Sequence, residues 1–446
     1  MTTTSGPGTP GLLAATLPVL DLAVASVAAV QDAAARAGRT APAPPPDPER
    51  VAAAFASDRL LRVDGEPVDG FAPLSGFFRA ADGWVRTHAN YPHHRARLLA
   101  LLVLPHGTAA NPTRDDVTAA LAERSAQDVE DAAAATGAIA VRVRTEDEWR
   151  ASAPGRAAAS GTPVRTAVRD DDGAARPLDR GPRPLAGVRV LDLTRVIAGP
   201  VATRTLALLG ADVLRLDPPR LPEIEVQHLD TGQGKRSALL DLATRDGRTR
   251  AQELLDAADV LVTGYRPGAV EAFGLGLPPG AVRARVTAWG DDGPWAGRRG
   301  FDSIVQAASG IALVEGSRDG ATSPPANATP GALPAQALDH ATGYLVAAAV
   351  VDALAGRAAD GRGRDVDGAL ARTAHALLVA PRRDPAHGEP RTPGPRCVVA
   401  HRALLDGRGV TLTTTRPALD RLAGEGVDDY AAPARPWGQD DPAWPA

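Results

Sequence analysis

Apolar residues between Pro184 and Gly310 repeat first with the period of a strand and then with the period of a helix. Helical spacing occurs at Gly199–Leu209 and Gly247–Ala258. Short runs of branched apolar residues predict five buried strands, at Gly187–Leu193, Ala211–Asp217, Arg236–Leu242, Ala258–Gly264 and Ala284–Gly290. Strands that alternate with helical crossovers form a parallel sheet. The sequence therefore predicts an α/β fold with a Rossmann-like, doubly wound parallel sheet, followed by a last helix at Asp365–Ala380.

Ligands of such sheets bind beyond the carboxyl ends of the strands. The loops at those ends are Thr194–Ala198, Asp217–Pro219, Gly264–Gly268 and Trp289–Gly300. No G-x-G-x-x-G follows the first strand, no G-x-S-x-G is present, and TGQGKRS lacks the first glycine of a P-loop. The sequence therefore disfavours a dinucleotide cofactor.

A smaller α/β domain is predicted ahead of the sheet. An Ala-rich helix at Leu17–Gly38 and a proline-rich linker at Arg39–Pro48 precede it. Within it, FFRAADGWVRTHAN predicts two strands around the turn Ala81–Gly83, and Thr113 and Ser125 predict helix N-caps because an aspartate follows each by three residues. The predicted division is residues 1–48 for the helix and linker, 49–170 for the small domain, 184–380 for the large domain and 381–446 for a linker and tail.

Composition narrows the range of partners. The 446 residues are 44% hydrophobic and 23% charged with a net charge of −4, which predicts a soluble protein without a nucleic-acid or membrane partner. The apolar N-terminus lacks a basic region and is interrupted by Pro18 and Asp21, which favours a cytoplasmic location. Cys397 is the single cysteine, so an intramolecular disulfide is excluded. The spacing of His88, His93 and His94 matches no standard zinc pattern, and we predict no metal.

Five stretches occur in unbroken order from Pro184 to Ala380: LDLTRVIAGPVATRTLALLGADVLRLDPP, GKRSALLDL, ADVLVTGYRPGAVEAFGLG, GPWAGRRGFDSIVQAASG and ALDHATG. Together they resemble the family III CoA-transferases, the group that contains formyl-CoA and carnitine CoA-transferases and α-methylacyl-CoA racemase. The resemblance implies a homodimer that uses an acyl-CoA thioester and a carboxylic acid as substrates and binds no permanent cofactor. In that family a segment like Phe77–Arg150 follows the large domain, whereas here it precedes it.

Asp339 is the candidate catalytic residue. It precedes the apolar helix predicted at Gly343–Leu354, so the residues alone predict an N-cap, and the helix N-terminus would then hold its carboxylate ionised. The resemblance implies that Asp339 is the nucleophile of the family and carries CoA as a thioester in a ping-pong exchange. Gly343 matches the closing glycine of the same motif.

The resemblance also implies a CoA site. Lys235, the one lysine of the chain, would meet a phosphate, as would Arg266 and Arg299, with Arg298 nearby. The other positions carried over to CoA binding are Ile197, Ala198, Leu240, Asp241, Leu242, Ala243, Gly264, Tyr265 and Asp302.

Two alternatives stay open. The racemase branch transfers a proton at the α-carbon and needs a histidine immediately before Asp302, where this chain has Phe301; His340 could substitute. The other alternative is a non-catalytic protein that binds CoA esters.

Overall fold

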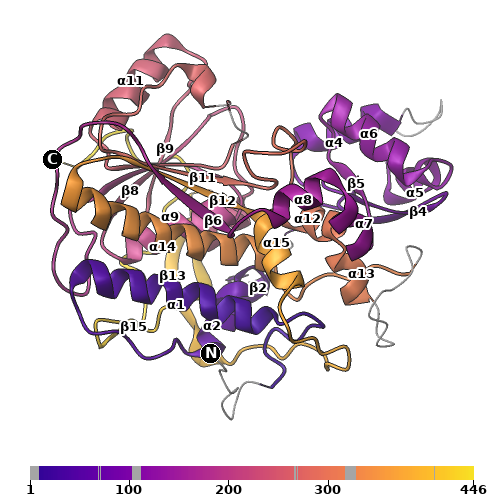
Figure 1. Cartoon of the computed structure of the whole chain (residues 1–446), viewed down its shortest axis with the longest axis horizontal. Helices are drawn as coiled ribbons and strands as arrows, with labels where there is room; N and C mark the ends of the chain where they lie inside the picture. Colours follow the sequence, from indigo (N-terminus) through magenta and orange to yellow (C-terminus); the bar gives the residue numbers. More distant parts are fainter. Residues whose placement is uncertain are drawn as a thin grey trace.

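The computed structural model describes residues 10–68, 70, 72–102, 112–265, 268, 270–316, 328–405 and 407–445. At its centre lies a seven-stranded sheet in the order β6-β12-β11-β10-β7-β8-β9 (Figure 1). All neighbouring strands of this sheet pair in parallel except β6, which pairs antiparallel with β12. The bounds are β6 Val164–Val168, β7 Arg189–Leu193, β8 Asp212–Asp217, β9 Arg236–Leu239, β10 Val260–Thr263, β11 Val282–Thr287 and β12 Arg364–Ala369.

The predicted Rossmann-like parallel sheet is confirmed, and its five predicted strands correspond to β7 to β11. The helix predicted at Asp365–Ala380 is wrong in its first part, because β12 occupies that stretch and α15 (Leu370–Leu378) begins after it. Strand β12 has little apolar surface, since Asp365 and Asp367 on one of its faces pair with arginines of β11. That pairing across strands cannot be read from a local pattern.

Alternate strand residues enter two separate cores, one on each face of the sheet. Val190, Val213 and Val260 pack on the face covered by α9 (Ala198–Leu208) and α14 (Ala337–Asp360). Their neighbours along the strands, such as Leu191 and Leu214, pack on the other face with leucines of α11 (Arg245–Asp256). Burial on both faces explains the apolar runs from which the strands were predicted.

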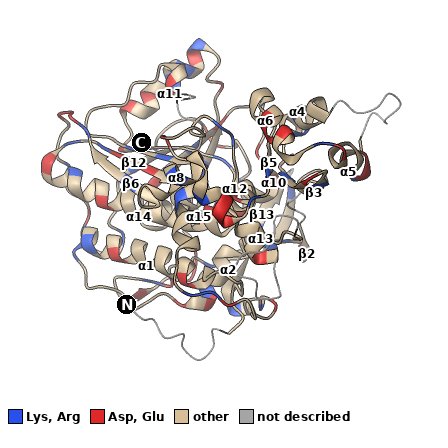
Figure 2. Ribbon diagram, turned by 45° about the vertical axis from the view of Figure 1, so that its right-hand side comes forward, with Lys and Arg blue, Asp and Glu red and all other residues tan. Residues whose placement is uncertain are grey.

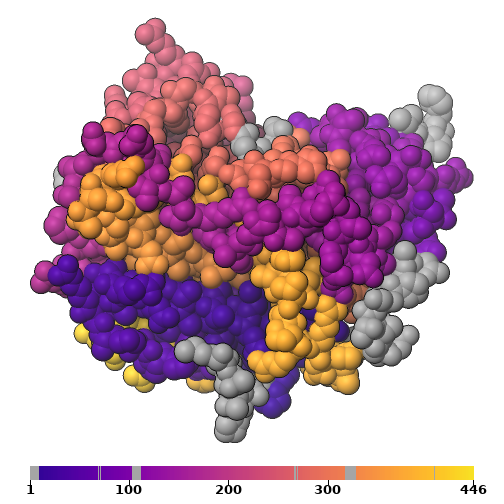
Figure 3. Space-filling view, viewed as in Figure 1, coloured from indigo at the N-terminus to yellow at the C-terminus, as the bar shows by residue number. Residues whose placement is uncertain are grey.

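Helix α1 (Val19–Gly38), two residues shorter than predicted, packs along α14 on the side away from the sheet (Figure 1). In the space-filling view its indigo surface lies directly below the orange surface of the later chain (Figure 3). Helix α14 has the length and apolar composition of a membrane span, but 83% of its most apolar window is buried inside the protein. Sandwiched between α1 and the sheet, α14 is therefore the central helix of the core.

The small α/β unit has a core of its own. Strands β3 (Gly76–Ala80) and β4 (Gly83–Thr87) form the predicted hairpin, and β5 (Ala140–Arg142) pairs with β4. The predicted N-caps are confirmed, since Thr113 Oγ1 accepts the N–H of Asp116, and Ser125 Oγ accepts that of Asp128. The helices of this unit are α4 Pro92–Leu102, α5 Arg114–Ala122, α6 Ala126–Thr136 and α7 Glu146–Ala151.

The limits of the small unit are narrower than the predicted 49–170. Strand β6 belongs to the large sheet, and β1 (Arg62–Val63) pairs with β14 (Arg408–Thr415) in a separate sheet. The C-terminal tail, through β14, thus shares a sheet with residues that the prediction assigned to the small domain. The other elements of the sheet that holds β14, and the helices beside it, are α2 Pro48–Phe55, α3 Ser57–Leu60, β2 Glu66–Pro67 and β13 Val398–Leu405.

Short elements complete the described chain: α8 Ala153–Ala159, α10 Glu225–Thr231, α12 Asp302–Ser309, α13 Ile311–Gly316, the 3-10 helices Glu271–Phe273 and Pro395–Cys397, and the strand pair β15 Arg421–Leu422 and β16 Glu425–Gly426. Basic and acidic residues are interspersed over the whole ribbon in the view of Figure 2. This distribution agrees with the small net charge of −4.

Candidate active site

A cavity of about 370 Å³ opens at the carboxyl ends of β7, β10 and β11. The loop after β7 supplies Ile197 and Ala198, and the end of β10 supplies Gly264 and Tyr265. Asp339, in the first turn of α14, lies on the same wall. The cavity therefore occupies the place where the sheet topology predicts a ligand.

The small unit closes the other side of this cavity. Helix α4 and the residue before it contribute Tyr91, His93, His94 and Arg97. The hydroxyl of Tyr91 donates a hydrogen bond to Glu223, which also accepts the N–H of Val196 at 3.0 Å. Two parts of the chain that are far apart in sequence are thus joined at the cavity wall.

Helix α14 begins at Ala337, so Asp339 is the third residue of its first turn, and the helix predicted at Gly343–Leu354 is longer at both ends. The prediction that Asp339 is the N-cap is wrong. The capping acceptor is the side chain of Asp302, whose Oδ2 accepts the backbone N–H of Leu338 at 2.8 Å and of Asp339 at 3.0 Å. Asp302 opens α12 and is 0% exposed.

Gln306 completes this cap from the next turn of α12. Its Nε2 donates to Asp302 Oδ1, and its Oε1 accepts the N–H of Leu333 at 3.0 Å. The D-x-x-x-Q motif thus places both side chains on one face of the helix. Asp302 is buried and does not line the cavity, which does not support its predicted contact with CoA. Its side chain instead binds the first turn of α14.

The two aspartates oppose each other's ionisation. Burial, and then the charge of Asp302, raise the pKa of Asp339 well above its ordinary range. Burial raises the pKa of Asp302 to about 6, although the backbone N–H groups of Asp339 and Leu338 and the amide of Gln306 act in the opposite direction. The sequence predicted that the helix N-terminus would keep Asp339 ionised. The structure does not support that prediction, because the N–H donors of the helix bind Asp302 instead, and burial and the charge of Asp302 both favour the protonated form of Asp339.

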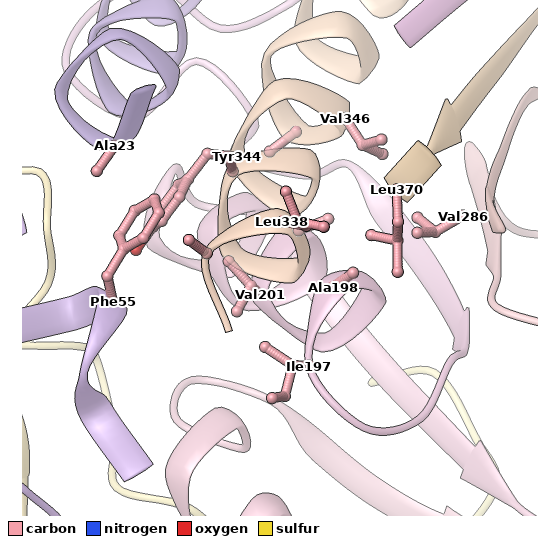
Figure 4. Packing of buried hydrophobic residues seen from close by; sticks show 14 of the residues in the cluster. Ala23, Phe55, Ile197, Ala198, Val201, Val286, Leu338, Tyr344, Val346 and Leu370 are labelled. Atoms are coloured by element: carbon pink, nitrogen blue, oxygen red, sulfur yellow. The ribbon is translucent and has the colours of Figure 1, made fainter. Parts of the chain in front are cut away.

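Gly343 lies one turn beyond Asp339 and faces α9. A Cβ atom there would lie 2.5 Å from the carbonyl oxygen of Ala198 and 3.0 Å from Cβ of Val201. Figure 4 shows Leu338 of α14 with Val201 and Ala198 of α9 close by. The glycine therefore lets the start of α9 approach α14 so closely that Ala198 and Asp339 line one cavity.

The family model described as CoA-transferase family III matches residues 185–396. Residues 185–396, called the family III segment below, are therefore similar to CoA-transferase family III. The match includes the whole β7-to-α15 region, with Asp302, Gln306, Asp339 and Gly343. The small unit lies ahead of it.

Curated relatives of the family III segment carry transferase names. One is "Acetyl-coenzyme A transferase nodX" of Hypoxylon pulicicidum, 37% identical over 42% of this chain and 32% of its own length. Another is "Probable fatty acyl-CoA transferase Rv3272" of Mycobacterium tuberculosis, 33% identical over 42% of this chain and 50% of its own. A solved structure of Rv3272 is 33% identical, covering 44% of this chain and 56% of that chain, with a TM-score of 0.38. The chain thus spans about a third to a half of the length of the curated relatives that it matches.

The cavity of about 370 Å³ brings together some of the residues predicted to bind CoA. Ile197, Ala198, Gly264, Tyr265 and Arg299 line it with Asp339, and so does Arg298. Leu240, Asp241, Leu242 and Ala243 follow β9 at the same edge of the sheet but do not line the cavity. Arg266 lies outside the described residues.

Lys235 is not at the cavity. It is 4% exposed, and its Nζ donates to Asp192 Oδ2 at 3.1 Å and to Thr203 Oγ1 at 3.0 Å, under α9. Burial lowers its pKa to about 8. Lys235 thus forms a buried ion pair inside the family III segment, which does not support the predicted phosphate contact.

Several histidines surround the cavity. The ring of His88 stacks on Phe301 with centroids 3.6 Å apart, and His94 meets the same ring edge-on at 5.7 Å. Burial lowers the pKa of His94 to about 3, so it is neutral. His340 does not line the cavity but stacks on Phe55 at 5.2 Å, so it does not supply the base that a racemase would need.

The sequence does not predict that Tyr91, His94 and Arg97 line the cavity, because no ligand-binding motif marks these positions of the small unit. Their position beside the seven-stranded sheet depends on contacts between the small unit and the family III segment. In the described part of the chain, no group of three His, Cys, Asp or Glu side chains could hold a metal ion. The absence of a metal stays a prediction.

Proposed function

We propose that the protein is a CoA-transferase that moves CoA from an acyl-CoA thioester to a free carboxylic acid, with Asp339 as its covalent nucleophile. The observation that supports this most directly is the carboxyl group of Asp339 on the wall of a cavity at the carboxyl ends of the family III sheet. The relatives are named as CoA-transferases, for example "Succinyl-CoA:glutarate CoA-transferase" of Homo sapiens, 30% identical over 42% of this chain and 44% of its own length.

The proposed exchange of CoA consists of acyl-transfer steps only, and no atom is oxidised or reduced. A carboxylate oxygen of Asp339 attacks the thioester carbonyl of the donor, and the C–S bond breaks to release CoA thiolate. Thiolate is a fair leaving group because ordinary thiols have a pKa of about 8.5. The thiolate then attacks the Asp339 carbonyl of the mixed anhydride, which gives an aspartyl-CoA thioester and the free acid. The acceptor carboxylate repeats both steps in reverse and restores Asp339.

Asp339 must be ionised to attack, whereas burial and Asp302 favour its neutral form. We infer that the ionised fraction of Asp339, whose proton has passed to solvent, is the form that attacks the thioester. Asp302 holds the backbone of Asp339, and its charge opposes ionisation of the Asp339 side chain. A substitution that removes the charge of Asp302 should therefore shift the pH profile of the reaction. This division gives one carboxyl group to chemistry and the other to positioning.

CoA would lie along the loops that line the cavity. The backbone of Ile197 and Ala198 can bind the pantetheine chain, Tyr265 can stack, and Arg299 can bind an anionic group. Val286 and Leu370 give the inner wall an apolar surface, near Ala198 in Figure 4. An acyl chain fits this surface better than a charged group does.

Isotope exchange tests the proposal. A panel of acyl-CoA donors is incubated with labelled carboxylic acids, and label in the acyl-CoA is measured for the wild type, Asp339→Asn and Asp339→Ala. We expect exchange by the wild type and a loss of many orders of magnitude in both variants. Hydroxylamine after incubation with acyl-CoA should modify Asp339. Asp352→Asn, on the exposed face of the same helix, is the matched control. Full exchange by Asp339→Ala would contradict the proposal.

A second candidate is proton exchange at the α-carbon of an acyl-CoA. The observation that favours it is the neutral imidazole of His94 in the same cavity as Asp339, beside Phe301, which takes the place of the racemase histidine. Incubation of a 2-methylacyl-CoA in D2O tests it. Deuterium at the α-carbon that disappears in His94→Gln would favour this function, and its absence would leave the transferase proposal alone.

A further inference from the structure

Arg97 of the small unit and Arg299 of the family III segment meet where two cavities adjoin. The second cavity, of about 330 Å³, lies between residues 134–141 and the loop 297–299. Arg97, Arg298 and Arg299 line both cavities. Arg97 is not part of the family III segment, because it precedes the matched residues 185–396.

The two guanidinium groups converge beside Gly137, which ends α6. The position that a Cβ atom of Gly137 would take is 2.7 Å from Arg299 Nη1 and 3.8 Å from Arg97 Nη1. Arg299 Nη1 donates to the carbonyl oxygen of Gly137 at 3.3 Å. Both guanidinium groups therefore lie at the junction of the two cavities, where their like charges repel each other.

Arg97 is the group that needs such a partner. Its Nη1 is buried and has no hydrogen-bond partner among the described residues. Arg298, next along the loop, differs because Glu130 lies 3.5 Å from it and its guanidinium stacks on Trp295 at 4.4 Å. A buried donor without an acceptor loses free energy that a ligand oxygen can restore.

Carboxylates are scarce on this wall. Among the described residues that line the second cavity none is acidic, and Asp339 is the acidic residue of those lining the first. Arg195 also lines the first cavity, but Glu223 lies 3.7 Å from it. Burial, then His93 and the charges of Arg299, Arg97 and Arg195 lower the pKa of His94. A site of this charge attracts anions.

We propose that Arg97 and Arg299 bind an anionic oxygen group of the substrate at the junction of the two cavities, either a phosphate of CoA or a second carboxylate of the acid. Guanidinium groups form paired, charge-assisted hydrogen bonds with both. The choice of these two ligands rests on the proposed function. The small unit then recognises substrate as well as covering the sheet.

Calorimetry of the full chain separates the two sources. The probes are CoA and dephospho-CoA, which differ by the 3′-phosphate, and glutarate and valerate, which differ by one carboxylate. Arg97→Gln is compared with Arg95→Gln, a change on the same helix at a residue that lines neither cavity. Arg97→Lys, which keeps the charge, should fall between wild type and Arg97→Gln.

We expect Arg97→Gln to weaken binding of one charged probe by about tenfold or more, since its guanidinium bonds a charged oxygen. Loss with CoA but not dephospho-CoA identifies the 3′-phosphate, and equal loss with both identifies the diphosphate. Loss with glutarate but not valerate identifies a second carboxylate. Identical affinities of Arg97→Gln and Arg95→Gln for all four probes, or no binding of any probe to the wild type, would overturn the proposal.

This measurement needs no turnover. If exchange survives in Asp339→Ala while Arg97→Gln loses affinity, the transferase mechanism fails and the anion site stands. If Asp339→Ala abolishes exchange while Arg97→Gln matches Arg95→Gln, the reverse holds.

Discussion

Asp302 Oδ2 accepts the backbone N–H of Asp339 at 3.0 Å. Burial, and after it the charge of the same carboxylate, raises the pKa of the Asp339 side chain. One residue therefore fixes where the helix begins and opposes the charge that the nucleophile must acquire. Removing the charge of Asp302 while keeping its hydrogen bond should separate these two effects.

The first prediction concerns pH. In the wild type, kcat/KM for exchange should rise with pH through a pKa well above the 3.8 of an ordinary aspartate, because Asp339 reacts as a carboxylate. Asp302→Asn keeps an acceptor for the helix N–H groups but removes the opposing charge, so the profile should move to lower pH by roughly one unit or more. Steady-state kinetics from pH 5 to 9 measures this shift. An unchanged profile in a normally folded Asp302→Asn would show that the two groups are not coupled.

The second prediction concerns stability. A carboxyl group whose pKa is raised on folding contributes stability that is present below its unfolded pKa and is lost as pH rises through its folded pKa. Asp339→Asn removes this loss, so the variant should melt at a higher temperature than the wild type at pH 8. The difference should shrink toward pH 4. Calorimetric melting at several pH values measures it, and a variant less stable than the wild type at pH 8 would contradict the raised pKa.

The third prediction concerns Lys235. Lys235→Met leaves the Asp192 carboxylate buried without its cation, and should destabilise the fold by roughly 3 kcal/mol. The affinity for CoA should stay as in the wild type, since Lys235 does not line the cavity. Lys235→Met combined with Asp192→Asn should recover part of the stability. A selective loss of CoA affinity without destabilisation would restore the phosphate contact predicted from the sequence.

The fourth prediction concerns the two halves of the chain. A fragment beginning at Pro184 would expose the face of α14 that α1 covers, and apolar patches of that kind seldom stay exposed on soluble proteins. We expect it to be insoluble or inactive alone and to recover exchange when residues 1–183 are supplied separately. The full chain should be a homodimer in light scattering. A soluble, fully active fragment from Pro184 would show that the first 183 residues are dispensable.

Much of the fold follows from local patterns. Buried parallel strands are apolar along their length, so β7 to β11 could be predicted. The N-caps Thr113 and Ser125 could also be predicted, because each binds a backbone N–H only three residues further on. Strand β12 could not, since its polar residues are compensated by β11. Its formation depends on a neighbour, which a local window does not contain.

The candidate site divides in the same way. Asp339 and the loops after the strands could be placed from motifs, but the cap of its helix comes from Asp302, 37 residues earlier. Lys235 is the one lysine of the chain, which suggests a phosphate contact, but the sequence around it does not show that its side chain is buried. Arg97 lies in a unit without a motif, so its place at the cavity required the packing of the two units.

The packing of α1 on α14 has a consequence for biosynthesis. Nearly 300 residues separate the end of α1 at Gly38 from the start of α14 at Ala337, so α1 leaves the ribosome long before the helix that covers it. The small unit, with its own core, can fold meanwhile, whereas α1 must wait with its apolar face uncovered. Contacts this distant in sequence form slowly, and exposed apolar surface favours aggregation during the delay. The order of units in this chain therefore makes its yield in cells depend on translation speed and on chaperones that shield the first helix.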